Sequence, residues 1–164
     1  MRNFVITTDN TADLPYDYYK KNQIEYLFLS YTMDGKNYQK NAEMDPGEFY
    51  RKMRQGSMPT TSQANVEETM ETWRPLLDEG NDILHLAFSS GLSGSCNSAR
   101  IAANELKESY PDRKITVVDS LCASLGEGLF VDYAVEMKKA GKDMEEIAGW
   151  LEEHKLNFCH VFTV

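Results

Sequence analysis

The sequence predicts an α/β fold, a three-layer α/β/α domain with a mainly parallel sheet. Three short apolar runs rich in β-branched or aromatic residues have the length of buried strands: 4–7, 82–88 and 114–119. A segment of helical periodicity follows each run, and strands that alternate with helices form parallel sheets with helices on both faces. In such sheets ligands bind at the carboxyl ends of the strands, so the loops after these runs are candidate functional segments.

The N-terminal part begins with the strand at 4–7, a polar turn, and a helix that starts near Pro15, a residue typical of a first helical turn. The segment 24–32 is rich in β-branched and aromatic residues, and it precedes Asp34-Gly35, a pair that suits a tight turn. We therefore expect an extended segment with a hairpin excursion.

Two helices are expected between the hairpin and the second strand. Asp45-Pro46 fits an N-cap and the first position of a helix over 46–55. Apolar side chains then recur at helical spacing through 66–78, although Pro75 should weaken or kink the second half. Core packing is the simplest role for these apolar side chains.

The second half of the chain continues the alternation. A helix with a small apolar face follows Ser93, a long helix begins near Leu121 after the third strand, and Asp143 can cap a last helix. The run 158–164 has the composition of a strand. We expect residues 1–157 to form the α/β domain and 158–164 to be the first strand of a truncated second domain.

Composition narrows the class of protein. With 164 residues, 41% of them hydrophobic, the chain fits one globular domain. A net charge of −9 argues against a nucleic-acid partner, because phosphate binding needs clustered Lys and Arg. The 3 cysteines lack metal-ligand spacing and the N-terminus lacks a signal-peptide pattern, so we expect a cytoplasmic protein. No apolar run approaches the roughly 18 residues of a transmembrane helix.

Hydroxyl-rich segments stand at 59–63, 89–95 and 117–120, and those that follow strands should converge on one edge of the sheet. At 89–95 a strand runs directly into a helix, so amides and hydroxyls gather at a helix N-terminus, where anions bind. Ser93 and Ser95 offer hydroxyl donors, and the flanking glycines allow close approach of a ligand. A plain N-cap at Ser93 explains the same local pattern equally well.

A catalytic serine is the alternative interpretation of Ser93, because α/β-hydrolases also display their nucleophile on a strand-to-helix turn. The motif Gly-x-Ser-x-Gly is incomplete, since it has Gly91 but no closing glycine. A serine-dependent acyl hydrolase or transferase using Ser93 stays as the second hypothesis. No nucleotide-binding motif is present, and Asp9, Asp13 and Asp119 lack helical His or Cys partners, so we expect neither a cofactor nor a metal.

Four ordered motifs carry a resemblance to a known family. They are Ile6-Thr7-Thr8-Asp9-Asn10-Thr11-Ala12-Asp13-Leu14-Pro15, Pro59-Thr60-Thr61-Ser62-Gln63, Ser89-Ser90-Gly91-Leu92-Ser93-Gly94-Ser95 with Ala99, and Val118-Asp119-Ser120. From residue 2 to its end, the chain resembles the N-terminal domain of the DegV family of bacterial fatty-acid-binding proteins.

The resemblance implies a lipid carrier rather than an enzyme. Members of the family hold one long-chain fatty acid, with the acyl chain in an apolar tunnel and the carboxylate bound by loop hydroxyls, here those of Thr61 and Ser93. Some members present the acid to a fatty acid kinase, which is therefore an implied partner. The candidate ligand-binding residues are Thr61, Ser62, Ser93, Gly94 and Ser95.

The chain differs from the family pattern in three places. Asn10 stands where a serine is usual, and Phe28-Leu29 stands where a Pro-Leu pair is common. Members of the family also continue past the run at 158–164 into a second α/β domain that encloses the acyl chain. We expect the chain to lack that domain, and the resemblance then implies a half-open groove.

Overall fold

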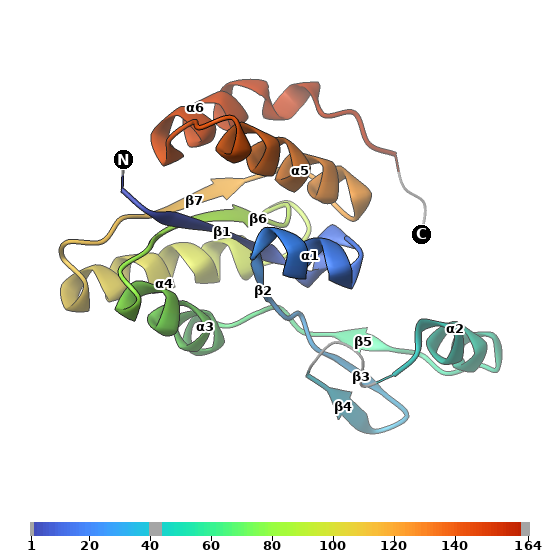
Figure 1. Cartoon of the computed structure of the whole chain (residues 1–164). Coiled ribbons are helices and arrows are strands. Elements are labelled where there is room, and N and C mark those ends of the chain that lie inside the picture. The colour runs from blue at the N-terminus through green and yellow to red at the C-terminus, as the bar shows by residue number, and fades with distance from the viewer. Residues whose placement is uncertain (1, 40–43, 162–164) are drawn as a thin grey trace.

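The computed structural model describes residues 2–39 and 44–161, and its centre is a parallel sheet in the order β2-β1-β6-β7 (Figure 1). The strands are β1 (Phe4–Asp9), β2 (Glu25–Leu27), β6 (Asp82–Ala87) and β7 (Ile115–Asp119). All neighbours run parallel, with Thr8 opposite Tyr26 on one side and Leu86 on the other. The predicted parallel α/β fold is confirmed.

Helices cover both faces of this sheet, as Figure 1 shows. On one face lie α5 (Leu125–Lys139) and α6 (Met144–His154), and on the other lie α3 (Val66–Asp78) and α4 (Ser95–Ser109). Alternate residues of β6 divide between the two layers, because Leu84 packs in the core with α5 and α6 while Ile83 packs in the core with α3 and α4. All six residues of β6 are buried, which is typical of a central parallel strand.

A small antiparallel sheet, ordered β4-β3-β5, extends from one side of the domain together with α2 (Pro46–Arg54) (Figure 1). Its strands are β3 (Tyr31–Met33), β4 (Lys36–Tyr38) and β5 (Thr60–Thr61). The predicted hairpin is β3–β4, and its turn has positive φ at Asp34 (53°) and Gly35 (76°), as a type I′ turn requires. Strand β5 pairs with β3 so that Thr61 lies opposite Tyr31.

All the predicted helices are found, including α1 (Tyr16–Asn22), and side-chain caps explain where three of them begin. Asp45 caps α2, while Asn65 and Asp143 form capping boxes at α3 and α6. Helix α3 continues past Pro75 to Asp78. Short 3₁₀ turns, Asn10–Ala12 and Lys155–Asn157, complete the described elements.

One predicted helix start and part of one predicted strand differ from the structure. The long helix begins at Leu125 rather than near Leu121, because Leu121 and Ser124 have φ of 56° and 50°, which no α-helix accommodates. Residues 158–161 lie outside any strand, so the strand predicted over 158–164 is not formed in that part. Residues 162–164 lie outside the described part of the chain.

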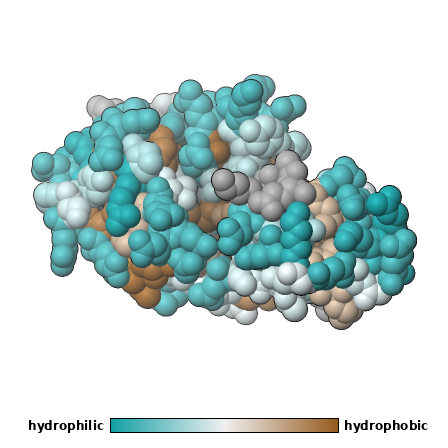
Figure 2. Space-filling view, turned by 90° about the horizontal axis from the view of Figure 1, so that it is seen from below, coloured by the Kyte–Doolittle hydropathy of each residue, from teal (hydrophilic) through white to brown (hydrophobic). Residues whose placement is uncertain are grey.

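The surface is largely hydrophilic on the face seen from below, with hydrophobic side chains in small separate patches (Figure 2). Among the described residues, no helix combines the length and the apolar character needed to cross a bilayer.

Candidate functional site

The loops that follow β1, β6 and β7 meet at one edge of the sheet, as the sequence predicts. The Ser89 amide donates to the Cys122 carbonyl at 3.0 Å, and the Ser120 amide donates to the Ala87 carbonyl at 3.1 Å. These bonds tie the loop after β6 to the loop after β7. The carboxyl ends of the central strands thus support one continuous polar surface.

Two aspartates hold the turn formed by Ser89–Ser95. Asp9 Oδ2 at the end of β1 accepts from the Phe88 amide at 2.7 Å, and Asp119 Oδ1 at the end of β7 accepts from the Ser90 amide at 3.1 Å. Both hydrogen bonds fix the backbone of the turn, a contact that loop aspartates commonly make. Within residues 2–39 and 44–161, no three His, Cys, Asp or Glu side chains cluster as a metal site would need.

Ser93 and Ser95 lie together at the start of α4. Their hydroxyl oxygens are 3.0 Å apart, and Ser93 Oγ also accepts from the Ser95 amide at 3.2 Å. The hydroxyl of Ser93 therefore satisfies a first-turn amide although Gly94 occupies the N-cap position. Ser93 is half-buried, whereas Ser95 is fully buried and its Oγ accepts from the Ala64 amide at 3.2 Å.

The second hydroxyl-rich segment lies against this turn. A Cβ added to Gly94 would be 2.1 Å from Gln63 Oε1, and Gln63 Nε2 donates to Ser98 Oγ at 3.3 Å. Thr61 and Ser62 precede this contact and are both exposed. Thr61 precedes Ala64, whose amide donates to Ser95 Oγ, by three residues. Because an extended chain spans at most about 3.6 Å per residue, Thr61 must lie close to the start of α4. The structure thus brings both hydroxyl-rich segments to one place.

An apolar groove of about 570 Å³ opens beside Thr61. It lies between the start of α1, the small sheet and α2, and aromatic rings form much of its wall, with Phe49 contacting Tyr31 at a centroid distance of 5.2 Å. Its lining residues are Asn10, Asp13, Leu14, Tyr16, Tyr19, Phe28, Tyr31, Met44, Pro46, Phe49, Tyr50, Pro59 and Thr61.

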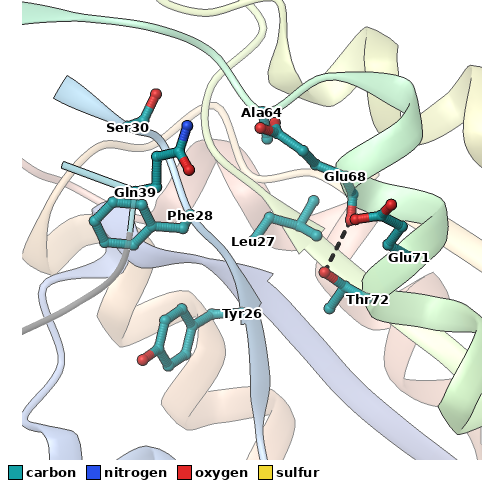
Figure 3. Close-up of a pocket in the computed structure, with 9 residues that line it drawn as sticks. All are labelled: Tyr26, Leu27, Phe28, Ser30, Gln39, Ala64, Glu68, Glu71 and Thr72. Atoms are coloured by element: carbon teal, nitrogen blue, oxygen red, sulfur yellow. Dashed lines mark hydrogen bonds between the residues drawn. The ribbon is translucent and has the colours of Figure 1, made fainter. Parts of the chain in front are cut away.

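Two further hollows flank the site. One of about 330 Å³ lies at the start of α5, where Leu125 and Leu129 face residues 159–161. Another of about 400 Å³ lies between the segment 26–30 and α3, and Figure 3 shows Glu68 and Glu71 projecting from α3 at its edge. Two glutamates make this third hollow a poor site for an anion, because like charges repel.

Two histidines, His85 and His154, have hydrogen-bond partners other than Ser93. His85 is buried in β6, where Nδ1 lies 3.0 Å from Thr7 Oγ1, and burial lowers its pKa to about 3. His154 Nδ1 bonds to the Trp150 carbonyl at 2.8 Å. His160 lies against Gly126 at the start of α5. The hydroxyl of Ser93 is instead hydrogen-bonded to that of Ser95.

Glu127, a fully buried carboxyl group in the first turn of α5, was not predicted from the sequence. Its Oε2 accepts from Thr11 Oγ1 at 2.8 Å. The neighbouring Gly128 permits this approach, because a Cβ there would be 2.6 Å from the Ala12 carbonyl oxygen. The available signal was the Gly-Glu-Gly spacing, since two glycines in one helical turn are unfavourable unless another segment packs closely against them.

Fold and site together define an α/β domain whose hydroxyl-rich loops and apolar hollows meet at the carboxyl edge of a parallel sheet. Comparison with known proteins agrees, because the model of the family described as "Uncharacterised protein, DegV family" matches residues 3–164. The chain belongs to the DegV family. A DegV domain-containing protein of Clostridium perfringens is 48% identical over 100% of this chain and 57% of its own length.

Solved structures give the same result. A fatty-acid-binding DegV family protein from Thermus thermophilus has a TM-score of 0.83 and 36% identity, covering 95% of this chain and 54% of its own. A stearic acid-binding protein from Eubacterium ventriosum has a TM-score of 0.84 and 28% identity, covering 91% and 52%. This chain therefore spans about half the length of the relatives that it matches.

Proposed function

We propose that this chain binds a long-chain fatty acid, with its carboxylate hydrogen-bonded by the hydroxyls of Thr61 and Ser93. The observation that carries this proposal is the convergence of two hydroxyl-rich segments beside an apolar groove of about 570 Å³, a volume typical of small-molecule sites. Ser62 and Gly94 follow Thr61 and Ser93 directly in the sequence. Buried Ser95 accepts from the Ala64 amide and so holds the segment that carries Thr61.

The relatives support the choice of ligand. The Thermus thermophilus protein is described as fatty acid binding and the Eubacterium ventriosum protein as stearic acid-binding. Each methylene group removed from water contributes about 0.8 kcal/mol, so an acyl chain supplies most of the affinity and the hydroxyls orient the carboxylate. This chain spans about half the length of those relatives, so fatty acid binding by the whole protein is itself something that we propose.

We assign the site a carrier role without catalysis. The reason is that Ser93 Oγ is hydrogen-bonded to the hydroxyl of Ser95, which is not a general base. In the cytoplasm, such a carrier would present its bound acid to a fatty acid kinase. ATP-dependent phosphorylation of the bound acid by such a kinase tests this partnership. Release of ADP should depend on this chain. Equal release without the chain would contradict the partnership.

Native mass spectrometry and affinity measurement with the Ser93→Ala variant test the function. Loss of one hydroxyl donor to a carboxylate costs about 1.5–3 kcal/mol, so Ser93→Ala should weaken fatty acid binding roughly tenfold to a hundredfold, and Thr61→Val should do the same. Ser109→Ala, at the exposed end of α4, is the matched control. Unchanged affinity in both variants would contradict the proposed site.

The alternative, a serine-dependent acyl hydrolase or transferase using Ser93, gives a different outcome. It rests on the position of Ser93 at a strand-to-helix turn. An enzyme of that kind would hydrolyse an activated acyl ester, and Ser93→Ala would abolish turnover. We expect no turnover that depends on Ser93.

A further inference from the structure

A buried pair of carboxyl groups, Asp9 and Glu127, lies beneath the Ser89–Ser95 turn. Both side chains have no exposed surface. No lysine or arginine in the described part of the chain forms an ion pair with either group. The titratable groups that face the pair are Tyr19 from α1, His85 from β6, Cys96 from α4, Cys122 from the loop after β7, and Asp13 and Asp119 nearby.

The hydrogen bonds around Glu127 accommodate a proton on its carboxyl group. Thr8 Oγ1 lies 2.8 Å from the Leu86 carbonyl oxygen and 3.0 Å from Glu127 Oε1. A hydroxyl has one hydrogen and the carbonyl can only accept. A protonated Glu127 completes both bonds, because Thr8 then donates to Leu86 and accepts from Glu127. The other oxygen of Glu127 accepts from Thr11 at 2.8 Å.

Asp9 is the anionic partner and has spare capacity for a proton. Its Oδ2 accepts from the Phe88 amide, but its buried Oδ1 has no hydrogen-bond partner among the residues described. His85 Nε2 is 3.9 Å from Asp9 Oδ2, which is too long for a hydrogen bond. Burial raises the pKa of Asp9 to about 7, and burial followed by the charge of Asp9 raises the pKa of Glu127 well above its usual range.

The pair is connected to the turn where the carboxylate of a ligand would bind. Asp9 holds the Phe88 amide, and the Ser93 amide donates to the Ser89 carbonyl at 3.1 Å, so Ser93 folds back next to the residue that Asp9 holds. Asp119 supports the same turn from the other side. A ligand carboxylate therefore adds a negative charge to a site that is already acidic, which favours protonation of the nearest buried carboxylate.

We propose that Asp9 and Glu127 share one proton in the free protein, with the proton on Glu127 and the negative charge on Asp9. Binding of a carboxylate at the Ser89–Ser95 turn then draws a second proton onto Asp9. The second half rests on the proposed fatty acid binding. Asp9 acts as a positioning residue whose charge state follows occupancy of the site. The affinity for a fatty acid then falls as the pH rises above neutrality, because the incoming proton becomes scarcer.

Calorimetry with dodecanoate between pH 6.5 and 9 tests the coupling. Uptake of one proton makes the dissociation constant rise toward tenfold per pH unit above neutrality in the wild type. Asp9→Asn, which keeps the acceptor for Phe88, should show a flat profile, and Glu136→Gln, an exposed glutamate of α5, should keep the wild-type profile. Equal slopes in the wild type and Asp9→Asn would overturn the coupling while leaving fatty acid binding intact.

The shared proton is tested on the ligand-free protein, so the result stands apart from the proposed function. Glu127→Gln keeps a donor for Thr8 and an acceptor for Thr11 but cannot ionise. A raised pKa makes the folded wild type bind more protons than the unfolded chain, so its stability falls as the pH rises from about 5 to 9. The Tm of Glu127→Gln relative to the wild type should rise over that range. A constant difference, with the Glu127 carboxyl ¹³C resonance titrating in the ordinary range of a glutamate, would overturn the proposal.

If dodecanoate does not bind at any pH, the proposed function fails and the coupling fails with it. The ligand-free Tm profile and the carboxyl resonance then still decide whether the proton is shared.

Discussion

Gly94 is the residue at which the two hydroxyl-rich segments come into contact. Its φ of −75° suits any amino acid, yet a Cβ would be 2.1 Å from Gln63 Oε1. Space rather than backbone conformation therefore requires glycine. This places the side chain of Gln63 between the turn that carries Ser93 and the strand that carries Thr61.

Gly94→Ala should displace the Gln63 side chain and break its hydrogen bond to Ser98. We expect a loss of about 1 kcal/mol in the free energy of unfolding, measured by urea denaturation. The double variant Gly94→Ala/Gln63→Ala removes the clash and should lose less than the sum of the two single variants. Additive losses would show that the contact is unimportant.

The place of Ser93 could be predicted from the sequence, because a buried strand precedes its glycine-rich turn and a helix follows it. This order puts the turn at the carboxyl end of the strand. Glu127 could not, because a charged residue in a helix ordinarily faces solvent. Its burial depends on Thr8, Thr11 and Asp9, which lie more than a hundred residues away in the chain. The Gly-Glu-Gly spacing indicates that another segment packs closely here, but it does not identify the residues that bind the carboxyl group.

At the scale of elements, β5 positions Thr61 although it is only two residues long. It is held by pairing with β3 and, just beyond its end, by the bond from the Ala64 amide to Ser95 Oγ. The sequence predicts β6 and β7 within a residue of their ends, because long buried runs are distinctive. A two-residue strand has no pattern of its own and exists only through its partner.

Ser95→Ala should loosen this element. The buried Ala64 amide loses its acceptor, which costs about 1–3 kcal/mol, and hydrogen exchange at Ala64 should accelerate more than exchange in the central sheet. Thr72→Val is the control, because the Thr72 hydroxyl donates to the Glu68 carbonyl of its own helix and its removal leaves no amide unpaired. Unchanged exchange at Ala64 would mean that β3 alone holds the segment.

For the whole molecule, one exposed stripe is conspicuous. Leu125 and Leu129 of α5 are 65% and 46% exposed, and Tyr133, which is 45% exposed, extends the same four-residue spacing. Exposed apolar stripes favour association between molecules, whereas the net charge of −9 opposes it. Salt weakens that repulsion.

We therefore expect the ligand-free chain to self-associate, and to do so more strongly at high salt. Sedimentation velocity measures the effect. Leu125→Glu/Leu129→Glu should give a monomer, while Leu156→Glu, at an exposed position outside the stripe, should behave as the wild type. A monodisperse wild-type monomer at high salt would contradict this expectation.

The strand order of the central sheet also determines when the molecule can fold. Strand β1 contacts β6 at a sequence separation of 78 residues, as the bond from Thr8 to Leu86 shows, whereas the β3–β4 hairpin closes over a few residues. Contacts distant in sequence form slowly because loop closure has an entropic cost. During synthesis the first strand must wait without its central neighbour until β6 has left the ribosome. Pulse-labelled hydrogen exchange should accordingly show protection of the β3–β4 hairpin before that of β1 and β6.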